Sequence, residues 1–579
     1  MNVAEAIAQA LCEAGIRRVY GLPGGENVEL LEALRRSGMD FVLVHNESSA
    51  LYMAAATARL QGRPGVCLTT LGPGLANAMA GLGHAWLDRA PLLLLTAQAP
   101  AALEGRHTHQ LLDQQALTRP LTKDTRALQP GDDARAIVQD LLRLAVSGRP
   151  GPVHLQLSRD LAASPAAPVT AATAFRIPAP ASPDLADLEG ARALWQNARR
   201  PLLLVGLGLD LQGCHTELLA LAEASQAPVV VTPKAKGAIR SNHPLAAGTI
   251  GLTRNDPVYE LLDEADCLLA VGFDAVELVR PWEALTPQPP FPVPGDGSSS
   301  QAEVASMHLH RIRDGPSQAG CEEGSTTQVD TFKVPLPEGE GFRVRASQLP
   351  LIWLAPWENE DPQLPADAAF VGEMAPVLRQ LTCDPGKTDA AWGATRVAQF
   401  REALAQRRFP APESGRMAPR DLLAALRHAA PGDTPLAVDV GSHKILASLE
   451  WPDLQSQRFF LSNGLSCMGY GLAAAIGASL ALERAPALCL TGDAGMTMVL
   501  GELELVTRLD LPVVTVVLND GALDLIRLAQ LRAGAAAWGT EFGNPDFAQI
   551  ARAFGIPALR SGDLAACETA VRDALRARQ

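Results

Sequence analysis

Two acidic turns near the carboxyl end constrain the fold of this chain most. The first is Thr491-Gly492-Asp493-Ala494-Gly495, and the second, Leu518-Asn519-Asp520-Gly521, ends the apolar run at 513–518. A helical pattern at about 500–509 separates them. A strand–helix–strand crossover makes two parallel neighbours whose carboxyl ends share one edge of a sheet. We therefore expect Asp493 and Asp520 to face one crevice, where open α/β sheets bind ligands.

The residue types in that crevice suit a magnesium–phosphate site. Carboxylate oxygens are hard ligands of the kind that Mg²⁺ prefers, and Mg²⁺ takes its other ligands from water and phosphate. The neighbouring glycines let backbone N–H groups approach a phosphate. The alternative is a pair of ordinary strand-to-helix turns with acidic helix caps, and the motif alone does not exclude it.

Short apolar runs alternate with helical patterns through the whole chain of 579 residues. This alternation predicts an α/β protein with three doubly wound parallel-sheet domains. We expect an N-terminal domain at 1–165, a Rossmann-like central domain at 184–380 and a C-terminal domain at 400–579, with a Pro/Ala-rich linker before the second. The expected strands include 41–44, 65–69, 92–96 and 153–157, and then the runs PLLLVGLGLD, PVVVTP, ADCLLAVGFD and LPLIWLAP.

Composition narrows the class of protein. A net charge of −14 and a pI near 5.3 argue against nucleic acid or an anionic membrane as partner. The nine cysteines are scattered without metal-binding spacing, as in a reducing compartment. The start MNVAEAIAQALCEAG has the pattern of an amphipathic helix rather than of a signal peptide. We therefore expect a cytoplasmic enzyme.

The two acidic turns resemble the Gly-Asp-Gly and Asn-Asn motif of thiamine diphosphate-dependent enzymes. The resemblance implies that Asp493, Asp520 and the backbone carbonyl of Ala522 hold Mg²⁺. Two positions depart from the motif, because Asp520 replaces Asn and Ala494 replaces the second Gly, a variant common in acetolactate synthases. The backbone implied to contact the cofactor there is that of Gly492, Ala494 and Gly495.

A glutamate after an N-terminal strand resembles the residue that activates the cofactor in acetolactate synthases. Val44-His45-Asn46-Glu47-Ser48-Ser49 follows an apolar run and opens a helical pattern. In the family this glutamate binds a nitrogen of the pyrimidine ring, so the resemblance makes Glu47 the candidate catalytic residue. The alternative is a glutamate that only interacts with the amino end of the helix.

Three other segments of the N-terminal block match loops of the family. Gly21-Leu22-Pro23-Gly24 resembles a loop near the reacting carbon, which implies a cofactor contact by Gly24. Leu71-Gly72-Pro73-Gly74-Leu75-Ala76-Asn77 resembles a second loop, with Asn77 expected as the cap of the following helix. Tight turns that need glycine would explain both loops equally well. His109-Gln110 aligns with a Phe-Gln pair of the substrate pocket, so Gln110 is a second candidate catalytic residue, whereas His109 is a pocket or a surface residue.

The third block supplies the rest of the implied site. Asp439-Val440-Gly441-Ser442-His443 resembles the diphosphate-binding segment, with Ser442 and His443 as donors. In Ser462-Asn463-Gly464-Leu465-Ser466-Cys467-Met468, the carbonyl of Ser466 is implied to accept from the cofactor amino group, and Met468 to wedge between its rings. Core filling is the alternative for Met468. Leu525 is implied to form an apolar wall beside the thiazolium ring.

The resemblance implies an acetolactate synthase-like enzyme that decarboxylates a 2-oxo acid and passes the product to an acceptor carbonyl. Simple decarboxylation is the rival, because the Arg and Trp that serve the acceptor in synthases align with Leu278 and Ala529. A catalytically inactive relic is the third alternative. Thiamine diphosphate and Mg²⁺ are the implied cofactors; FAD in the central domain is not favoured, because Gly206-Leu207-Gly208 is a weak signal. The resemblance also implies a homodimer or homotetramer, with active sites between subunits.

Two regions depart from the family pattern. Residues 287–348 are rich in Pro, Gly, Ser and charge, which predicts a disordered insertion in the central domain. The third block ends on the helical pattern TAVRDALRARQ, where relatives continue into a last strand. We therefore expect the final strand of the C-terminal sheet to be missing.

Overall fold

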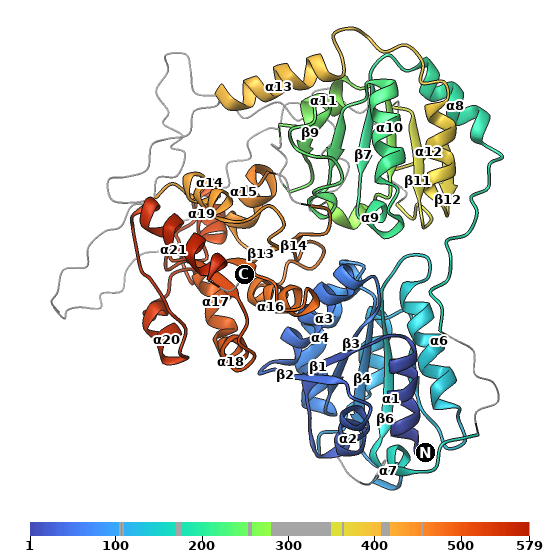
Figure 1. Cartoon of the computed structure of the whole chain (residues 1–579), viewed down its shortest axis with the longest axis vertical. Coiled ribbons are helices and arrows are strands. Elements are labelled where there is room, and N and C mark those ends of the chain that lie inside the picture. The colour runs from blue at the N-terminus through green and yellow to red at the C-terminus, as the bar shows by residue number, and fades with distance from the viewer. Residues whose placement is uncertain are drawn as a thin grey trace, which may run out of the picture.

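The computed structural model describes residues 1–103, 106, 109–168, 175–252, 257–278, 349–361, 364–406, 417–452 and 455–577. These residues form three sheets with interleaved helices, in three successive parts of the chain (Figure 1). The strand pairs within each sheet are parallel. The predicted α/β fold with three parallel-sheet domains is confirmed. The predicted insertion at 287–348 lies outside the described residues.

The N-terminal sheet has the strand order β2-β1-β3-β4-β6-β5. Its strands are β1 Arg18–Leu22, β2 Asp40–Leu43, β3 Gly65–Thr69, β4 Leu92–Gln98, β5 Thr125–Ala127 and β6 Pro152–Ser158. Its helices are α1 Val3–Glu13, α2 Val28–Arg36, α3 Glu47–Gln61, α4 Gly72–Leu87, α5 Gln114–Thr118, α6 Ala134–Val146 and α7 Arg159–Ala163.

The central sheet has the order β12-β11-β10-β7-β8-β9. Its strands are β7 Pro201–Val205, β8 Val229–Val231, β9 Ala246–Thr249, β10 Cys267–Val271, β11 Leu351–Ala355 and β12 Ala368–Val371. Its helices are α8 Leu188–Asn197, α9 Gly208–Gln212, α10 His215–Ser225, α11 Tyr259–Glu264, α12 Met374–Thr382 and α13 Ala394–Gln406. Strands β10 and β11 pair directly, with Leu268 opposite Leu351. The two apolar runs that flank the predicted insertion are therefore neighbours in the sheet.

The C-terminal sheet has the order β14-β13-β15-β16, the same arrangement as the first four strands of the N-terminal sheet. Its strands are β13 Leu436–Val438, β14 Phe459–Leu461, β15 Ala487–Gly492 and β16 Val513–Leu518. Its helices are α14 Pro419–Ala429, α15 Ser442–Glu450, α16 Tyr470–Ala481, α17 Asp493–Met498, α18 Leu503–Arg508, α19 Asp524–Arg532, α20 Phe547–Ala553 and α21 Leu564–Arg576. Among the described residues, β16 is the last strand and lies at an edge of this sheet.

The N- and C-terminal domains share one apolar core, although far apart in the sequence. Helix α3 packs against α16 (Figure 1), and one buried cluster draws side chains from both domains. The rings of Tyr52 and Tyr470 meet edge to face with centroids 5.5 Å apart. A Cβ on Gly477 would lie 2.5 Å from the carbonyl oxygen of Met53, so the small residues of α16 allow this close approach. The N- and C-terminal domains of the chain therefore form one packed unit.

Candidate active site

The crossover brings the two acidic turns together as expected. Strand β15 ends at Gly492, and Asp493 begins α17 with only 2% of its surface exposed. Its Oδ2 accepts from the backbone N–H of Asp520 at 3.1 Å and of Gly521 at 2.7 Å, because β16 lies beside β15. Its Oδ1 accepts from the N–H of Ala494 at 2.7 Å.

Asp520 and Ala522 offer further oxygens at the same edge. Burial raises the pKa of Asp520, and the charges of Asp493 and Asp524 act in the same direction. A cation beside Asp493 and Asp520 would relieve that repulsion. No group of three or more His, Cys, Asp or Glu residues that could hold a metal occurs in the described part of the chain. The candidate ligands are two carboxylates and one carbonyl, a number that suits Mg²⁺, which takes its other ligands from water and phosphate.

A returning segment, which the sequence did not reveal, covers this edge. Phe542 N–H donates to the carbonyl of Gly521 at 3.0 Å, and Leu523 N–H donates to the carbonyl of Thr540 at 2.7 Å. These two bonds flank the pair of Ala522 and Glu541 and leave the Ala522 carbonyl unused by the ladder.

Asn544 links this returning segment to the first acidic turn by hydrogen bonds. Its amide nitrogen donates to Asp493 Oδ2 at 2.5 Å and to Asn519 Oδ1 at 2.8 Å. Its own Oδ1 is buried and has no hydrogen-bond partner among the described residues. An asparagine at 544 has no local pattern that would have singled it out.

The residues expected to bind the diphosphate lie at the start of α15. His443 is 6% exposed, and its Nε2 is buried without a hydrogen-bond partner among the described residues. Burial lowers the pKa of His443 to about 4, so the ring is neutral at pH 7 and can donate from one nitrogen. A Cβ on Gly492 would lie 3.4 Å from the ring, which places the two segments side by side. Ser442 is exposed at the first position of the helix. A buried nitrogen without a partner beside a helix amino end fits a phosphate oxygen.

Asp439 ties together the loops around this site. Its Oδ2 accepts from the N–H of Gly469 at 3.0 Å and from the hydroxyl of Thr491 at 2.9 Å, and its Oδ1 accepts from the N–H of Val440. Burial raises the pKa of Asp439. The sequence placed this residue in the diphosphate segment but gave it no such role.

A buried lysine stabilises the loop that is expected to lie beneath the cofactor. Lys444 donates to the carbonyl of Ser462 at 3.1 Å and to the hydroxyl of Ser466 at 3.0 Å. Ser466 has a φ of +54°, a left-handed conformation that non-glycine residues rarely adopt. Met468, two residues on, is half-buried. The tight loop therefore keeps a strained backbone at the carbonyl implied to contact the cofactor.

Glu47 begins α3 and is 3% exposed. Asn46 caps the helix, since its side chain accepts from the N–H of Ser48 at 2.9 Å. A Cβ on Gly74 would lie 3.5 Å from Glu47 Oε1, so the second glycine loop lies against this carboxylate. Asn77 is not a helix cap, which corrects that expectation. Helix α4 already begins at Gly72, because Pro73 fixes a helical φ at its first turn, and Asn77 lies one turn further on.

The remaining N-terminal loops meet around Gly72. A Cβ there would lie 2.2 Å from the carbonyl oxygen of Gln110, an exposed residue with a φ of +59°. His109 is exposed as well. Gly24 lies against Thr70, since a Cβ at Gly24 would lie 2.2 Å from the threonine hydroxyl oxygen. The structure thus gathers three loops that are distant in the sequence.

Matches to protein families agree with this arrangement. Residues 1–117, 188–291 and 439–579 match, in order, the N-terminal TPP binding domain, the central domain and the C-terminal TPP binding domain of thiamine pyrophosphate enzymes. The chain belongs to the thiamine pyrophosphate enzyme family.

Relatives of this thiamine pyrophosphate enzyme match it over nearly its whole length. The acetolactate synthase isozyme 3 large subunit of Escherichia coli K12 is 27% identical over 565 residues, which covers 96% of this chain and 89% of the relative. Acetolactate synthase of Bacillus subtilis is 28% identical, covering 96% of this chain and 88% of the relative. A probable 2-ketoarginine decarboxylase of Pseudomonas aeruginosa is 28% identical, covering 99% and 91%. The chain is a thiamine pyrophosphate-dependent, acetolactate synthase-like enzyme.

The two residues that align with the acceptor-side Arg and Trp, and the residue expected to form an apolar wall, differ in their exposure to solvent. Leu278 is buried at 9% exposure and packs in the core of the central domain. Leu525, in the first turn of α19, is 42% exposed, and Ala529 is exposed on the same helix. The apolar wall expected from Leu525 is therefore an open surface in the single chain.

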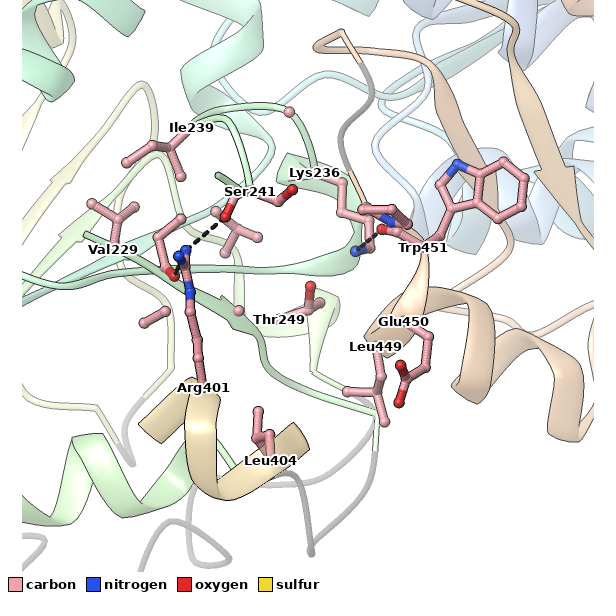
Figure 2. A pocket seen from close by; sticks show the side chains of 16 residues that line it. Val229, Lys236, Ile239, Ser241, Thr249, Arg401, Leu404, Leu449, Glu450 and Trp451 are labelled. Atoms are coloured by element: carbon pink, nitrogen blue, oxygen red, sulfur yellow. Dashed lines mark hydrogen bonds between the residues drawn. The ribbon is translucent and has the colours of Figure 1, made fainter. Parts of the chain in front are cut away.

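A cavity of about 200 Å³ lies away from the candidate site, between the central and C-terminal domains (Figure 2). Arg401 and Lys236 line it, but Arg401 donates to the carbonyl of Ser241 and Lys236 to that of Trp451. Both cations are thus engaged by backbone of the enzyme itself. None of the helices that the structure describes is long and apolar enough to cross a membrane.

Proposed function

We propose that this enzyme decarboxylates a 2-oxo acid such as pyruvate and transfers the remaining hydroxyalkyl group to an acceptor carbonyl. The observation that carries the proposal is the pairing of Asp493 with the Asp520 turn, beside the unpartnered nitrogen of His443. Such a pairing gives a cation and a diphosphate adjacent places. The similarity to acetolactate synthases supports the reaction.

Each group at the site has a proposed task. Asp493, Asp520 and the Ala522 carbonyl would hold Mg²⁺, with the backbone of Gly492, Ala494 and Gly495 beside the diphosphate. Ser442 and His443 would donate to phosphate oxygens. When bound, the cofactor supplies the carbon nucleophile and takes up the electrons that CO₂ leaves behind. Gly24, Asn77, Ser466, Met468 and Leu525 would contact the cofactor, and Gln110 the substrate.

Glu47 would exchange a proton with the pyrimidine ring. Its burial at 3% exposure supports this task, because a carboxylate shielded from water interacts strongly with a ring nitrogen. Glu47→Gln should lower turnover by about 10²–10⁴-fold, the usual range for a proton-transfer group. Steady-state kinetics beside cofactor titration check this. We expect the dissociation constant for the cofactor to change little, and full activity in the variant would exclude this task for Glu47.

One assay decides between synthase and decarboxylase. The purified enzyme is incubated with thiamine diphosphate, Mg²⁺ and a panel of 2-oxo acids, while CO₂, aldehyde and acetohydroxy acid are followed. The synthase should form CO₂ and an acetohydroxy acid. Release of CO₂ with aldehyde alone would favour simple decarboxylation, which Leu278 and Ala529, in place of the acceptor-side Arg and Trp, support. No CO₂ from any acid, without thermal stabilisation by the cofactor, would indicate an inactive relic.

We further propose that the enzyme works without a flavin at the glycine pair of the central domain. The N–H of Leu207 donates to Glu277 Oε1 at 3.1 Å and to Oε2 at 3.0 Å, so a side chain of the protein already engages the amide of this turn. Flavin absorbance in the purified protein would overturn this proposal.

We also propose that the enzyme is a cytoplasmic homodimer or homotetramer, which sedimentation can test. The proposed domain limits are 1–165, 184–380 and 400–579, which limited proteolysis can test. The eight cysteines described are free thiols, which supports a reducing compartment.

A further inference from the structure

The turn that carries Glu47 is held by the C-terminal domain as well as by its own. Glu502 ends the short 3₁₀ helix Leu500–Glu502 and is 1% exposed. Its Oε1 and Oε2 accept from the backbone N–H of His45, at 3.2 and 3.4 Å. A buried carboxylate of one domain is thus bonded to backbone two residues before Glu47.

The segment after Glu502 contacts the side chain of His45 and the carbonyl of Leu43. Glu504 Oε2 lies 3.0 Å from His45 Nε2, and Arg508 donates to the carbonyl of Leu43 at 2.5 Å. Arg508 also donates to Glu504 Oε1 at 2.9 Å. A Cβ on Gly501 would lie 3.2 Å from His45 Cβ, so the two backbones pack closely.

The burial of Glu502 needs an explanation that packing does not give. A carboxylate removed from water is unfavourable unless hydrogen bonds or a cation compensate. No Lys or Arg forms an ion pair with Glu502 among the described residues, and its carboxylate accepts from the backbone N–H of His45. Burial raises the pKa of Glu502, while the amides of His45 and Asn46 and the side chain of Ser49 oppose that rise. The carboxylate is therefore bonded to the backbone just before Glu47.

We propose that Glu502 is a positioning residue for Glu47. It fixes the backbone of the turn, so that the Glu47 carboxylate keeps its orientation towards the pyrimidine ring. Glu502 lies nine residues after Asp493, beyond α17, so one continuous segment bears both the candidate metal ligand and the support of Glu47. This inference rests on the task proposed above for Glu47.

The test separates orientation of Glu47 from general stability. Glu502→Ala and Glu502→Gln are compared with the wild type in the holoenzyme loaded with thiamine diphosphate and Mg²⁺. The rate at which the reactive carbon of the cofactor exchanges its proton for deuterium is measured by NMR after acid quench. Cofactor affinity and melting temperature are measured on the same samples. Glu504→Gln is the matched control, because Glu504 contacts the His45 side chain rather than the turn backbone.

We expect Glu502→Ala to slow exchange by about 10²-fold, the order of loss for a small misplacement of a reacting group, with cofactor affinity changed less than about threefold. Glu502→Gln keeps an oxygen acceptor for His45 and should recover part of the rate, whereas Glu504→Gln should match the wild type. Wild-type exchange in both Glu502 variants would overturn the proposal. Should Glu502→Ala not fold, Glu502→Gln decides, since it preserves shape. Normal exchange in Glu47→Gln would instead refute the task of Glu47, a separate failure.

Discussion

At the scale of single residues, the two aspartates of the candidate metal site differ in how far the protein compensates their negative charge. Asp493 has four hydrogen-bond donors around its carboxylate, from Ala494, Asp520, Gly521 and Asn544. Asp520, by contrast, is only partly shielded from solvent and lies near the carboxylates of Asp493 and Asp524. The negative charge of Asp520 should therefore destabilise the turn in the absence of a cation and strengthen the binding of a cation.

Asp520→Asn should therefore have opposite effects on metal affinity and on stability. The change keeps an oxygen and removes one negative charge, so we expect Mg²⁺ affinity to fall by about tenfold. The metal-free protein should be slightly more stable, because repulsion with Asp493 is relieved. Mg²⁺ titration followed by protein fluorescence, and melting in EDTA, measure the two quantities. Asp524→Asn is the control, since Asp524 already pairs with Arg527; an equal loss of affinity in both variants would count against a ligand role for Asp520.

Asn544 should support the metal site through Asp493 rather than through charge. Removing its side chain deletes the donors to Asp493 Oδ2 and Asn519 Oδ1. We expect Asn544→Ala to weaken Mg²⁺ binding severalfold, because a hydrogen bond to a charged group such as Asp493 contributes about 1.5–3 kcal/mol net. The same Mg²⁺ titration checks this. An unchanged affinity would show that the ladder at 540–542 holds the segment without Asn544.

At the scale of elements, the sequence predicted what depends on neighbouring residues. Apolar runs and the chirality of crossovers were enough to place Asp493 beside Asp520. The expected cap at Asn77 was wrong, because Pro73 begins α4 earlier. Asn544 could not be predicted, since its position depends on how the chain returns from α19 to β16. The edge strand β9 was also missed, being only the four residues Ala246–Thr249, one of them a glycine.

Three loops of the central sheet converge on one buried carboxyl. Glu277 accepts from the N–H of Leu207 after β7, from the hydroxyl of Thr232 after β8 and from the N–H of Asp274 after β10. Burial raises its pKa from 4.5 to about 8. Because the folded chain binds this proton more tightly, the stability that Glu277 contributes is fully present below pH 4.5 and is lost as the pH rises through about 8.

Glu277→Gln should remove that pH dependence. The amide can accept from Leu207 and Asp274 and donate to the hydroxyl of Thr232, so the neutral state is preserved at every pH. We expect the wild-type melting temperature to fall more steeply than that of the variant between about pH 5 and about pH 9. Thermal unfolding across this interval measures it. Glu189→Gln, an exposed carboxyl on α8, should follow the wild type; parallel curves for Glu277→Gln and the wild type would contradict the prediction.

At the scale of the whole molecule, the domains meet through polar contacts on one side and an apolar core on the other. Asn463 of the C-terminal domain donates to the Glu277 carbonyl at 2.6 Å and to Asp88 of the N-terminal domain at 3.1 Å. Asp88 also pairs with Lys234 of the central domain; although burial opposes its ionisation, Lys234 and His84 hold its pKa below the usual range. This junction and the core shared by α3 and α16 fix how the three domains of the chain are placed relative to one another.

Widening the contact of α3 with α16 should therefore affect stability and the site together. Gly477→Ala places a Cβ 2.5 Å from the Met53 carbonyl oxygen, so the helices must separate. Overpacking of this kind costs about 1–3 kcal/mol. Calorimetry should show a lower melting temperature, and cofactor titration a weaker affinity, because α3 begins at Glu47 and α16 follows the loop of Ser466 and Met468. Gly190→Ala is the control: a Cβ there meets nothing within 4 Å, and alanine favours α8 by about 0.5–1 kcal/mol. Equal melting temperatures of both variants would mean that the contact of α3 with α16 accommodates the added methyl group. The contacts of Asn463 and Asp88 alone would then fix how the domains are spaced.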